Sequence, residues 1–308
     1  MDKKILFSIG GGLLLLGLLG FIATVANKPE LPSNKLLVTA SFYPLYFFSE
    51  QIAGDKAIVI NITPAGAEPH EYEPTAQDIA NIYEAKLLIL NGVGLEPWGD
   101  NMKQNIDPNK TKIVEVSEGV ANNQYENKEG GITQDPHIWL NPLLAKEIAV
   151  KIATGFIQAD PENKNFYEFN LDALKEKLDA LDEEYRQGLK TCQQKNIVTS
   201  HNAFEYLASA YGLRQVPISG ISTEEEPSAQ DLVQVAKFVK DNKVEYIFFE
   251  TLVSPKLAET IANEVGVQTL VLNPIEGLTK EEIGKGKNYF TEMQNNLKNL
   301  QIALQCKP

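Results

Sequence analysis

A stretch of seven residues occurs twice in this chain with the same chemical pattern. Residues 73–79 read Glu-Pro-Thr-Ala-Gln-Asp-Ile, and residues 226–232 read Glu-Pro-Ser-Ala-Gln-Asp-Leu. In each copy a Thr or Ser stands three positions before an Asp, which is the pattern of a capping box at the start of a helix. Equivalent loops therefore enter equivalent helices in the two halves. We predict two related α/β lobes that flank a ligand-binding cleft, with the ligand at the carboxyl ends of the strands.

Apolar segments alternate with amphipathic segments in both halves, as expected for parallel sheets that are covered by helices on both faces. In the first half the sequence predicts strands at 35–40, 57–62 and 86–91 and helices at 44–54 and 75–85. In the second half it predicts strands at 196–200, 213–218, 244–250 and 267–272, and helices at 202–211, from Ser228, from Ser254 and over 285–304.

Residues 160–190 predict one long helix between the halves, because apolar residues recur every three or four positions from Tyr167 to Leu189. At about 1.5 Å per residue this helix is roughly 45 Å long, enough to join two lobes into one stiff body. The predicted organisation is an N-terminal α/β lobe over 35–159, this linking helix, and a C-terminal α/β lobe over 191–308.

The first 26 residues form an export signal or a membrane anchor, because two lysines precede an apolar run that ends at Ala26. Small residues at Thr24 and Ala26 predict cleavage after Ala26, and retention of the run as a single span is the alternative. Residues 27–34 are a linker. No cysteine lies near the run, which argues against a lipidated N-terminal cysteine.

The chain contains two cysteines, Cys192 and Cys306, and export places them in an oxidising compartment. We predict that they form a disulfide that ties the C-terminal tail to the start of the second lobe. Two free thiols are the alternative.

The acidic composition narrows the range of partners. The 308 residues include 28 Lys plus Arg against 41 Asp plus Glu, a net charge of −13, and no stretch of the sequence is locally basic. Since such a chain repels phosphate backbones, nucleic acid is excluded as a partner.

All three histidines of the chain stand in similar settings. His70, His137 and His201 each lie beside a predicted strand end and just ahead of a predicted helix. His137 precedes Asn141 and Pro142, which can cap and begin a helix. Neutral imidazoles that converge from loops at strand ends suit a zinc site.

Two carboxylates compete for a fourth ligand position. Glu276 lies in the turn after the last predicted strand, where its side chain can point across the cleft, and we predict it as the ligand. Glu250 ends an earlier strand, and it is either an alternative ligand or the acceptor of a ligand histidine's second N–H.

Five ordered motifs resemble those of the zinc and manganese solute-binding proteins of bacterial ABC transporters, a family that includes metal-binding lipoproteins and adhesins. The matching stretches are residues 69–75, 135–142, 200–207, 220–228 and 272–278. The resemblance covers nearly everything after residue 34. It implies two α/β lobes joined by one long rigid helix, with the ion in the cleft between them. It also implies that His70 and His137 come from the first lobe and His201 and Glu276 from the second.

In the family the third ligand position distinguishes metals, being His in zinc receptors and often Glu in manganese receptors. His201 therefore favours Zn²⁺ over Mn²⁺, and three imidazoles with one carboxylate suit tetrahedral zinc. The resemblance implies a non-enzymatic, periplasmic receptor that captures zinc with high affinity and delivers it to an inner-membrane permease. We expect the receptor to be a monomer.

The chain departs from the family's usual pattern before its second ligand motif. Residues 118–134 are polar, lack periodicity and contain no histidine, whereas many zinc receptors carry a histidine-rich loop there. We predict a mobile loop without accessory zinc ligands. The fourth ligand position holds Glu where many relatives have Asp, which alters the reach of the side chain.

Two other classes of function fit some of the same residues. A secreted zinc hydrolase would use the three histidines with Glu71 or Glu250 as general base, although the chain lacks a His-Glu-x-x-His helix. An adhesin is a further alternative, since some relatives are described so, but the sequence offers no adhesive motif.

Overall fold

The structure, a computed structural model, describes residues 35–126, 132–221 and 227–307. The chain divides into two units, residues 1–35 and 36–308, and the second unit holds the fold described below. The predicted leader (residues 1–26) and linker lie outside the described residues. Within the described ranges, no helix is both long enough and apolar enough to span a membrane.

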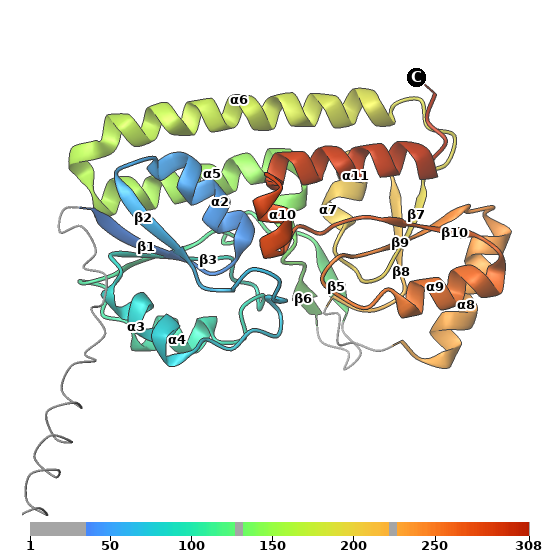
Figure 1. The fold of residues 1–308 in the computed structure, drawn as a ribbon, viewed down its shortest axis with the longest axis horizontal. Helices are drawn as coiled ribbons and strands as arrows, with labels where there is room; N and C mark the ends of the chain where they lie inside the picture. Colours follow the sequence, from blue (N-terminus) through green and yellow to red (C-terminus); the bar gives the residue numbers. More distant parts are fainter. Residues whose placement is uncertain (1–34, 127–131, 222–226, 308) are drawn as a thin grey trace, which may run out of the picture. The chain divides into compact units, whose positions relative to one another are not determined.

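The first half of the fold is a four-stranded parallel sheet in the order β2-β1-β3-β4 (Figure 1). Helices α2 and α5 cover one face of this sheet, and α3 and α4 cover the other. The elements are β1 (Leu36–Ala40), α2 (Tyr43–Ala53), β2 (Ala57–Asn61), α3 (Ala76–Glu84), β3 (Leu87–Leu90), α4 (Gly99–Asn105), β4 (Lys112–Glu115), β5 (Gln124–Glu126), β6 (Ile132–Gln134), the 3₁₀ turn η1 (Ile138–Leu140) and α5 (Pro142–Ala159).

The second half repeats this arrangement. Its parallel sheet has the order β10-β9-β7-β8, so that each sheet places its first strand between its second and third. The elements are β7 (Asn196–Thr199), α7 (Glu205–Ala210), β8 (Arg214–Pro217), α8 (Ala229–Asp241), β9 (Tyr246–Phe249), α9 (Lys256–Val265), β10 (Gln268–Val271), α10 (Lys280–Gly284) and α11 (Tyr289–Ala303). The sequence prediction of two α/β lobes with covered parallel sheets is confirmed.

The repeated heptapeptide occupies equivalent places in the two lobes. Each copy follows the second strand of its sheet and runs into the first turn of the next helix, α3 or α8, and residue 226 of the second copy lies outside the described residues. Thr75 and Ser228 each accept a hydrogen bond from the backbone N–H three residues later, and Asp78 and Asp231 complete the capping boxes. The local signal is therefore a true start of a helix in both copies.

A single long helix joins the lobes, as predicted. After the 3₁₀ turn η2 (Pro161–Asn163), helix α6 (Lys164–Leu189) continues for 26 residues along both lobes (Figure 1). Its buried face consists of residues at the predicted spacing, among them Leu174, Leu181 and Leu189. The Cys192–Cys306 disulfide ties the chain just after α6 to the tail after α11, which confirms the predicted pair.

One continuous hydrophobic core runs through both lobes. The ring of Trp139 lies 4.7 Å from that of Phe42, and the Tyr289 ring of α11 lies 4.8 Å from that of Phe48. Two buried hydrogen bonds cross between the lobes at the same place: Trp139 Nε1 donates to the carbonyl of Pro274 (2.7 Å), and the Tyr289 hydroxyl donates to the carbonyl of Trp139 (2.6 Å). These contacts fix the position of the two lobes relative to each other on either side of the cleft.

Two local predictions are wrong. Residues 118–134 are not an irregular loop throughout, because β5 pairs antiparallel with β6. The Tyr206 hydroxyl of the second lobe accepts hydrogen bonds from the backbone N–H groups of Asn122 and Asn123 (2.9 and 3.0 Å), a contact that local sequence does not reveal. Residues 127–131 of that stretch lie outside the described residues.

The predicted last helix over 285–304 begins too early. Gly286 adopts φ +80° after α10. The Asn288 side chain then accepts hydrogen bonds from the backbone N–H groups of Phe290 and Thr291, which starts α11. A left-handed glycine followed by an Asn cap ends one helix and begins another, even where the apolar spacing suggests one continuous helix.

Candidate metal centre

His137 is completely buried and enters the site from the first lobe. It lies between β6 and η1, in the segment that leads into α5, where Asn141 caps the helix and Pro142 begins it as predicted. Asp135 Oδ1 accepts hydrogen bonds from the backbone N–H of His137 (3.0 Å) and from its Nδ1 (2.8 Å). Because Nδ1 carries the donated proton, Nε2 is left as the metal-binding nitrogen.

His201 mirrors this arrangement in the second lobe. It follows β7, is 1% exposed, and its Nδ1 lies 2.7 Å from Glu250 Oε1. Glu250 follows β9, the neighbour of β7 in the sheet, so parallel pairing brings the two carboxyl ends of the strands together. The structure thus places Glu250 against the outer nitrogen of His201, while Nε2 of His201 points toward His137.

His70 comes from the loop between β2 and α3. Its side chain is 6% exposed, and Nε2 lies 3.3 Å from Nε2 of His137. The loop is rich in Pro and Gly, and its end is fixed by the Thr75 capping box. His70 therefore reaches the cluster on a segment that is held at its entry to α3.

Glu276 lies in the turn after β10 and is 1% exposed. Asn273 Oδ1 accepts a hydrogen bond from the backbone N–H of Ile275, whose φ is +58°. The backbone N–H of Asn273 donates to Asn296 Oδ1 of α11 (2.8 Å), and the backbone carbonyl of Asn273 accepts from Asn296 Nδ2 (2.6 Å). This turn aims the Glu276 carboxylate across the cleft at the histidines.

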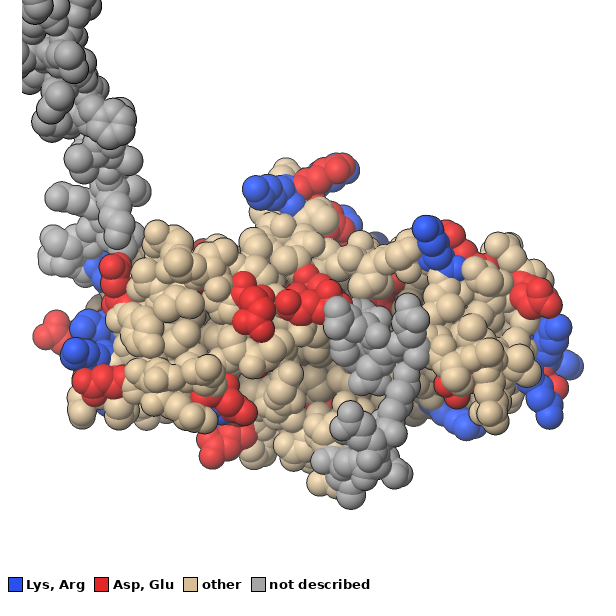
Figure 2. Space-filling model, turned by 90° about the horizontal axis from the view of Figure 1, so that it is seen from below, with Lys and Arg blue, Asp and Glu red and all other residues tan. Residues whose placement is uncertain are grey.

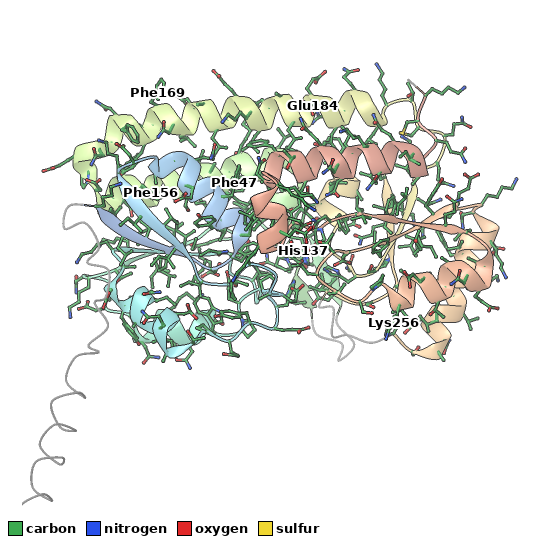
Figure 3. The ribbon with its side chains drawn as sticks, in the orientation of Figure 1. Phe47, His137, Phe156, Phe169, Glu184 and Lys256 are labelled. Atoms are coloured by element: carbon green, nitrogen blue, oxygen red, sulfur yellow. A yellow bond between two sulfur atoms is a disulfide. The ribbon has the colours of Figure 1, made fainter. Side chains whose placement is uncertain are left out.

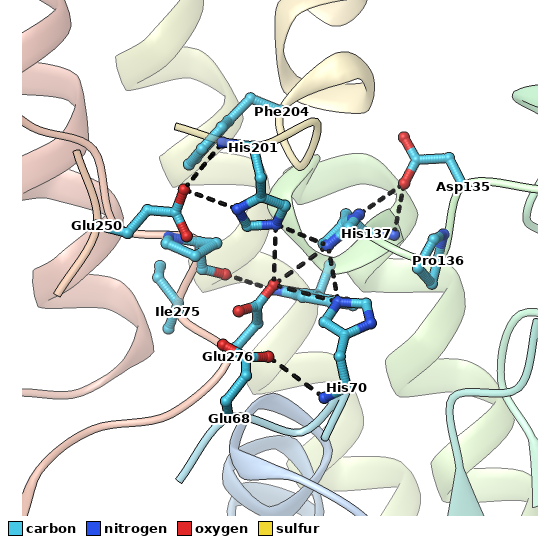
Figure 4. A network of polar contacts seen from close by, with 12 residues as sticks. Glu68, His70, Asp135, Pro136, His137, His201, Phe204, Glu250, Ile275 and Glu276 are labelled. Carbon is cyan, nitrogen blue, oxygen red and sulfur yellow. Dashed lines mark hydrogen bonds and ion pairs between the residues drawn. The ribbon is translucent and has the colours of Figure 1, made fainter. Parts of the chain in front are cut away.

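The four predicted residues come together. Each offers one ligand atom, and these atoms all lie within 4.8 Å of one another. Glu276 Oε1 is 3.1, 3.6 and 3.7 Å from Nε2 of His137, His201 and His70, and the His137–His201 separation is 3.4 Å (Figure 4). Figure 3 shows His137 between the two sheets, deep in the molecule.

These separations fit a single tetrahedral ion. Bonds of about 2.0–2.1 Å at tetrahedral angles leave neighbouring ligand atoms about 3.4 Å apart. Five of the six separations lie at 3.1–3.7 Å and scatter around that value, and the sixth, between His70 and His201, is no more than 4.8 Å. Three imidazole nitrogens and one carboxylate oxygen are also the donor types that zinc accepts.

The buried charges affect one another strongly. Burial lowers the pKa of His70. Burial opposes the charged forms of His137 and His201 as well, but hydrogen bonds and attraction to Asp135, Glu250 and Glu276 outweigh it and raise the pKa of both imidazoles. The contacts with the histidines likewise overcome burial at Glu276 and hold its pKa well below the usual range.

Sequence reasoning missed two acidic residues at the site. Asp135 was part of a recognised motif but had no role, and Glu68 was not singled out at all. Burial, and then the nearby Glu276 carboxylate, raises the pKa of Glu68 to about 9. The Glu-Pro-His order, which puts an acid two positions before a candidate ligand, was the available signal.

A surface pocket of about 390 Å³ reaches the cluster beside His201. Its lining includes Glu71 of the first lobe and Ser200, Ser219 and Lys256 of the second. Figure 2 shows the face seen from below in Figure 1, where several Asp and Glu side chains lie together near the middle, while other acidic and basic side chains lie at the ends and along the upper edge. An acidic face attracts cations to a site of this kind.

The fold has two α/β lobes, each with a parallel sheet, and one helix that bridges them. Together with a buried cluster of three histidines and a glutamate, it defines a metal-binding solute receptor. The chain belongs to the family described as zinc-uptake complex component A, periplasmic, whose model matches residues 38–303. The chain is therefore a binding component of a zinc-uptake system that operates outside the cytoplasm, and the family implies ABC transporter components as partners. The hydrolase alternative does not hold.

Individual relatives agree with this assignment. The chain is 38% identical over 312 residues to the high-affinity zinc uptake system protein ZnuA of Bacillus subtilis, covering 98% of each chain. It is 39% identical to the zinc-binding lipoprotein AdcA of Streptococcus pneumoniae, of which it spans 60%. The crystal structure of the Zn(II)-bound ZnuA-like domain of AdcA superposes with a TM-score of 0.76 at 40% identity, covering 88% of this chain and 99% of that domain.

Proposed function

We propose that this chain captures one Zn²⁺ ion with high affinity through His70, His137, His201 and Glu276 and delivers it to the membrane permease of an ABC importer. The observation that supports this most is the convergence of four donor atoms, from four loops that are remote in sequence, at the spacing of a tetrahedral ion. Such a closed donor set suits binding rather than catalysis, which needs an open position.

The ion binds to imidazole rings that are already oriented, and it displaces the protons that the raised pKa values of His137 and His201 favour in the ion-free chain. Asp135 and Glu250 fix the rings of His137 and His201, so little ordering remains when the ion enters. His70 and Glu276 complete the tetrahedron from the other two loops. Release to the permease requires that docking separates these loops, because all four donors are at least largely buried.

The relatives named for zinc support the choice of metal. His201 supplies a nitrogen at the position where manganese receptors often carry an oxygen donor, and zinc accepts more nitrogen than manganese does. We also propose that the apolar N-terminal run exports the chain and is cleaved after Ala26 or retained as an anchor, which places the receptor in the periplasm.

Calorimetric titration with zinc and manganese in competition tests the proposal. We expect one zinc per chain, displacement of manganese by zinc, and loss of most zinc affinity in His137→Ala and His201→Ala. Tyr83→Ala, at a half-exposed ring on α3, is the control and should bind zinc as the unaltered protein does. Unchanged zinc affinity in both histidine variants would refute the assignment of the ligands.

A further inference from the structure

A second carboxyl group lies against the cluster. Glu68 stands two residues before His70 in the same loop, and its Oε1 accepts the backbone N–H of His70 (3.3 Å). The other oxygen, Oε2, is buried and has no hydrogen-bond donor within the described part of the chain. Figure 4 shows the Glu68 side chain beside that of Glu276.

Glu276 has an unsatisfied oxygen too. Its Oε1 faces the three histidines, whereas Oε2 is buried without a hydrogen-bond donor among the described residues. Buried carboxylate oxygens need a donor or a cation, and two neighbouring carboxyl groups repel each other when both are charged, so the pair holds either a proton, as the raised pKa of Glu68 indicates for the ion-free protein, or a cation. Glu68 lies beside the group of four mutually close donor atoms and not within it, so a small shift of its side chain would give the site more oxygen ligands than a four-coordinate ion uses.

We propose that Glu68 is an additional oxygen donor to the bound ion and determines how well the site accepts ions that need more oxygen ligands than zinc, such as Mn²⁺. This inference rests on the proposed function, because it assigns a further residue to the same metal site. Zinc is satisfied by four ligands, whereas manganese prefers carboxylate oxygen and a higher coordination number. Glu68 thus broadens a donor set that His201 otherwise biases toward zinc.

The position of Glu68 suits this role. Pro69 lies between Glu68 and His70, and its ring fixes its own φ. This restricts the backbone that carries both side chains. The hydrogen bond from the His70 N–H holds Oε1 of Glu68, and this keeps the Glu68 carboxyl group close to Glu276.

The substitution Glu68→Gln tests the inference. Gln has the same shape and still accepts a hydrogen bond from the His70 N–H, but it removes the carboxyl group, which alone can give up its proton to a cation and become an anionic donor. We expect Mn²⁺ affinity to fall by about tenfold, equivalent to about 1.4 kcal/mol, while Zn²⁺ affinity changes by less than about threefold. The visible spectrum of the Co²⁺-substituted protein should change from five-coordinate to four-coordinate character. Glu73→Gln, which removes an exposed acid from the same loop, is the matched control and should change neither.

The outcomes separate this inference from the proposed function. If Glu68→Gln weakens zinc and manganese binding equally, Glu68 acts only as a charge or as a support for the loop. If it changes neither affinity and leaves the cobalt spectrum unaltered, Glu68 does not coordinate the ion. Either result overturns the inference and leaves zinc capture intact. Failure of the unaltered protein to bind zinc overturns the proposed function itself. If Glu68→Gln lowers the thermal stability of the ion-free protein, Glu68→Asp provides the same comparison with the charge kept and the reach shortened, and it should retain part of the manganese affinity.

Discussion

The bond between Glu250 and His201 gives the sharpest test of how the site obtains its affinity. Glu250 is 3% exposed, and its Oε1 lies 2.7 Å from Nδ1 and 3.3 Å from the backbone nitrogen of His201. The substitution Glu250→Gln preserves the volume and an acceptor oxygen but removes the negative charge. It therefore changes the electrostatic support of the imidazole with little effect on packing.

The expected magnitude follows from the kind of hydrogen bond that is lost. A bond to a charged group contributes about 1.5–3 kcal/mol, against about 0.5–1.5 kcal/mol for a neutral one, so neutralising Glu250 costs on the order of 1 kcal/mol or more. Carboxylates that orient a ligand histidine typically contribute about 10–100-fold in metal affinity. We expect Glu250→Gln to weaken zinc binding by at least about tenfold, or about 1.4 kcal/mol.

The assay is competition for zinc against a chromophoric chelator at fixed pH and ionic strength. His201→Ala, which removes the ligand itself, marks the full loss, and Glu245→Gln, an exposed acid just before β9, is the matched control. Unaltered affinity in a folded Glu250→Gln protein would refute the orienting role. A loss as large as that of His201→Ala would instead indicate that Glu250 is a ligand.

Three further predictions concern the scaffold and the protons. Trp139→Phe leaves the buried Pro274 carbonyl without its donor, and urea denaturation should show a loss of about 1–3 kcal/mol in unfolding free energy; no loss would mean that this bond does not hold the lobes together. Replacing Cys192 and Cys306 with Ser opens a link of 114 residues and should cost about 2–4 kcal/mol while zinc affinity stays unchanged, because neither sulfur belongs to the metal cluster. Zinc affinity should fall as pH is lowered from 8 to 6, because the ion binds neutral imidazole and nearby carboxylates raise the pKa of two ligand histidines above the ordinary value of 6.5. The same raised pKa values stabilise the ion-free fold on the acid side, and this contribution is lost as pH rises through them, so ion-free melting curves and zinc titrations should show opposite trends.

Some parts of the fold were predictable because their causes are local. The two capping boxes, the helix start at Asn141 and Pro142, and the apolar spacing of α6 depend on residues within one or two turns of each other. The β5–β6 pair was not predictable in this way, because its strands depend on partners elsewhere, including the hydroxyl of Tyr206.

The same distinction applies to the metal centre. The sequence by itself determined which side chains are available as ligands, since it contains only three histidines and places each beside a strand end. It left Glu276 and Glu250 as competitors and passed over Glu68. Only the tertiary structure decided between them, because distances across the cleft depend on the order of the strands in each sheet and on the packing of Trp139 between the lobes. Contacts between such remote segments are set by the whole core and leave little trace in any one stretch of sequence.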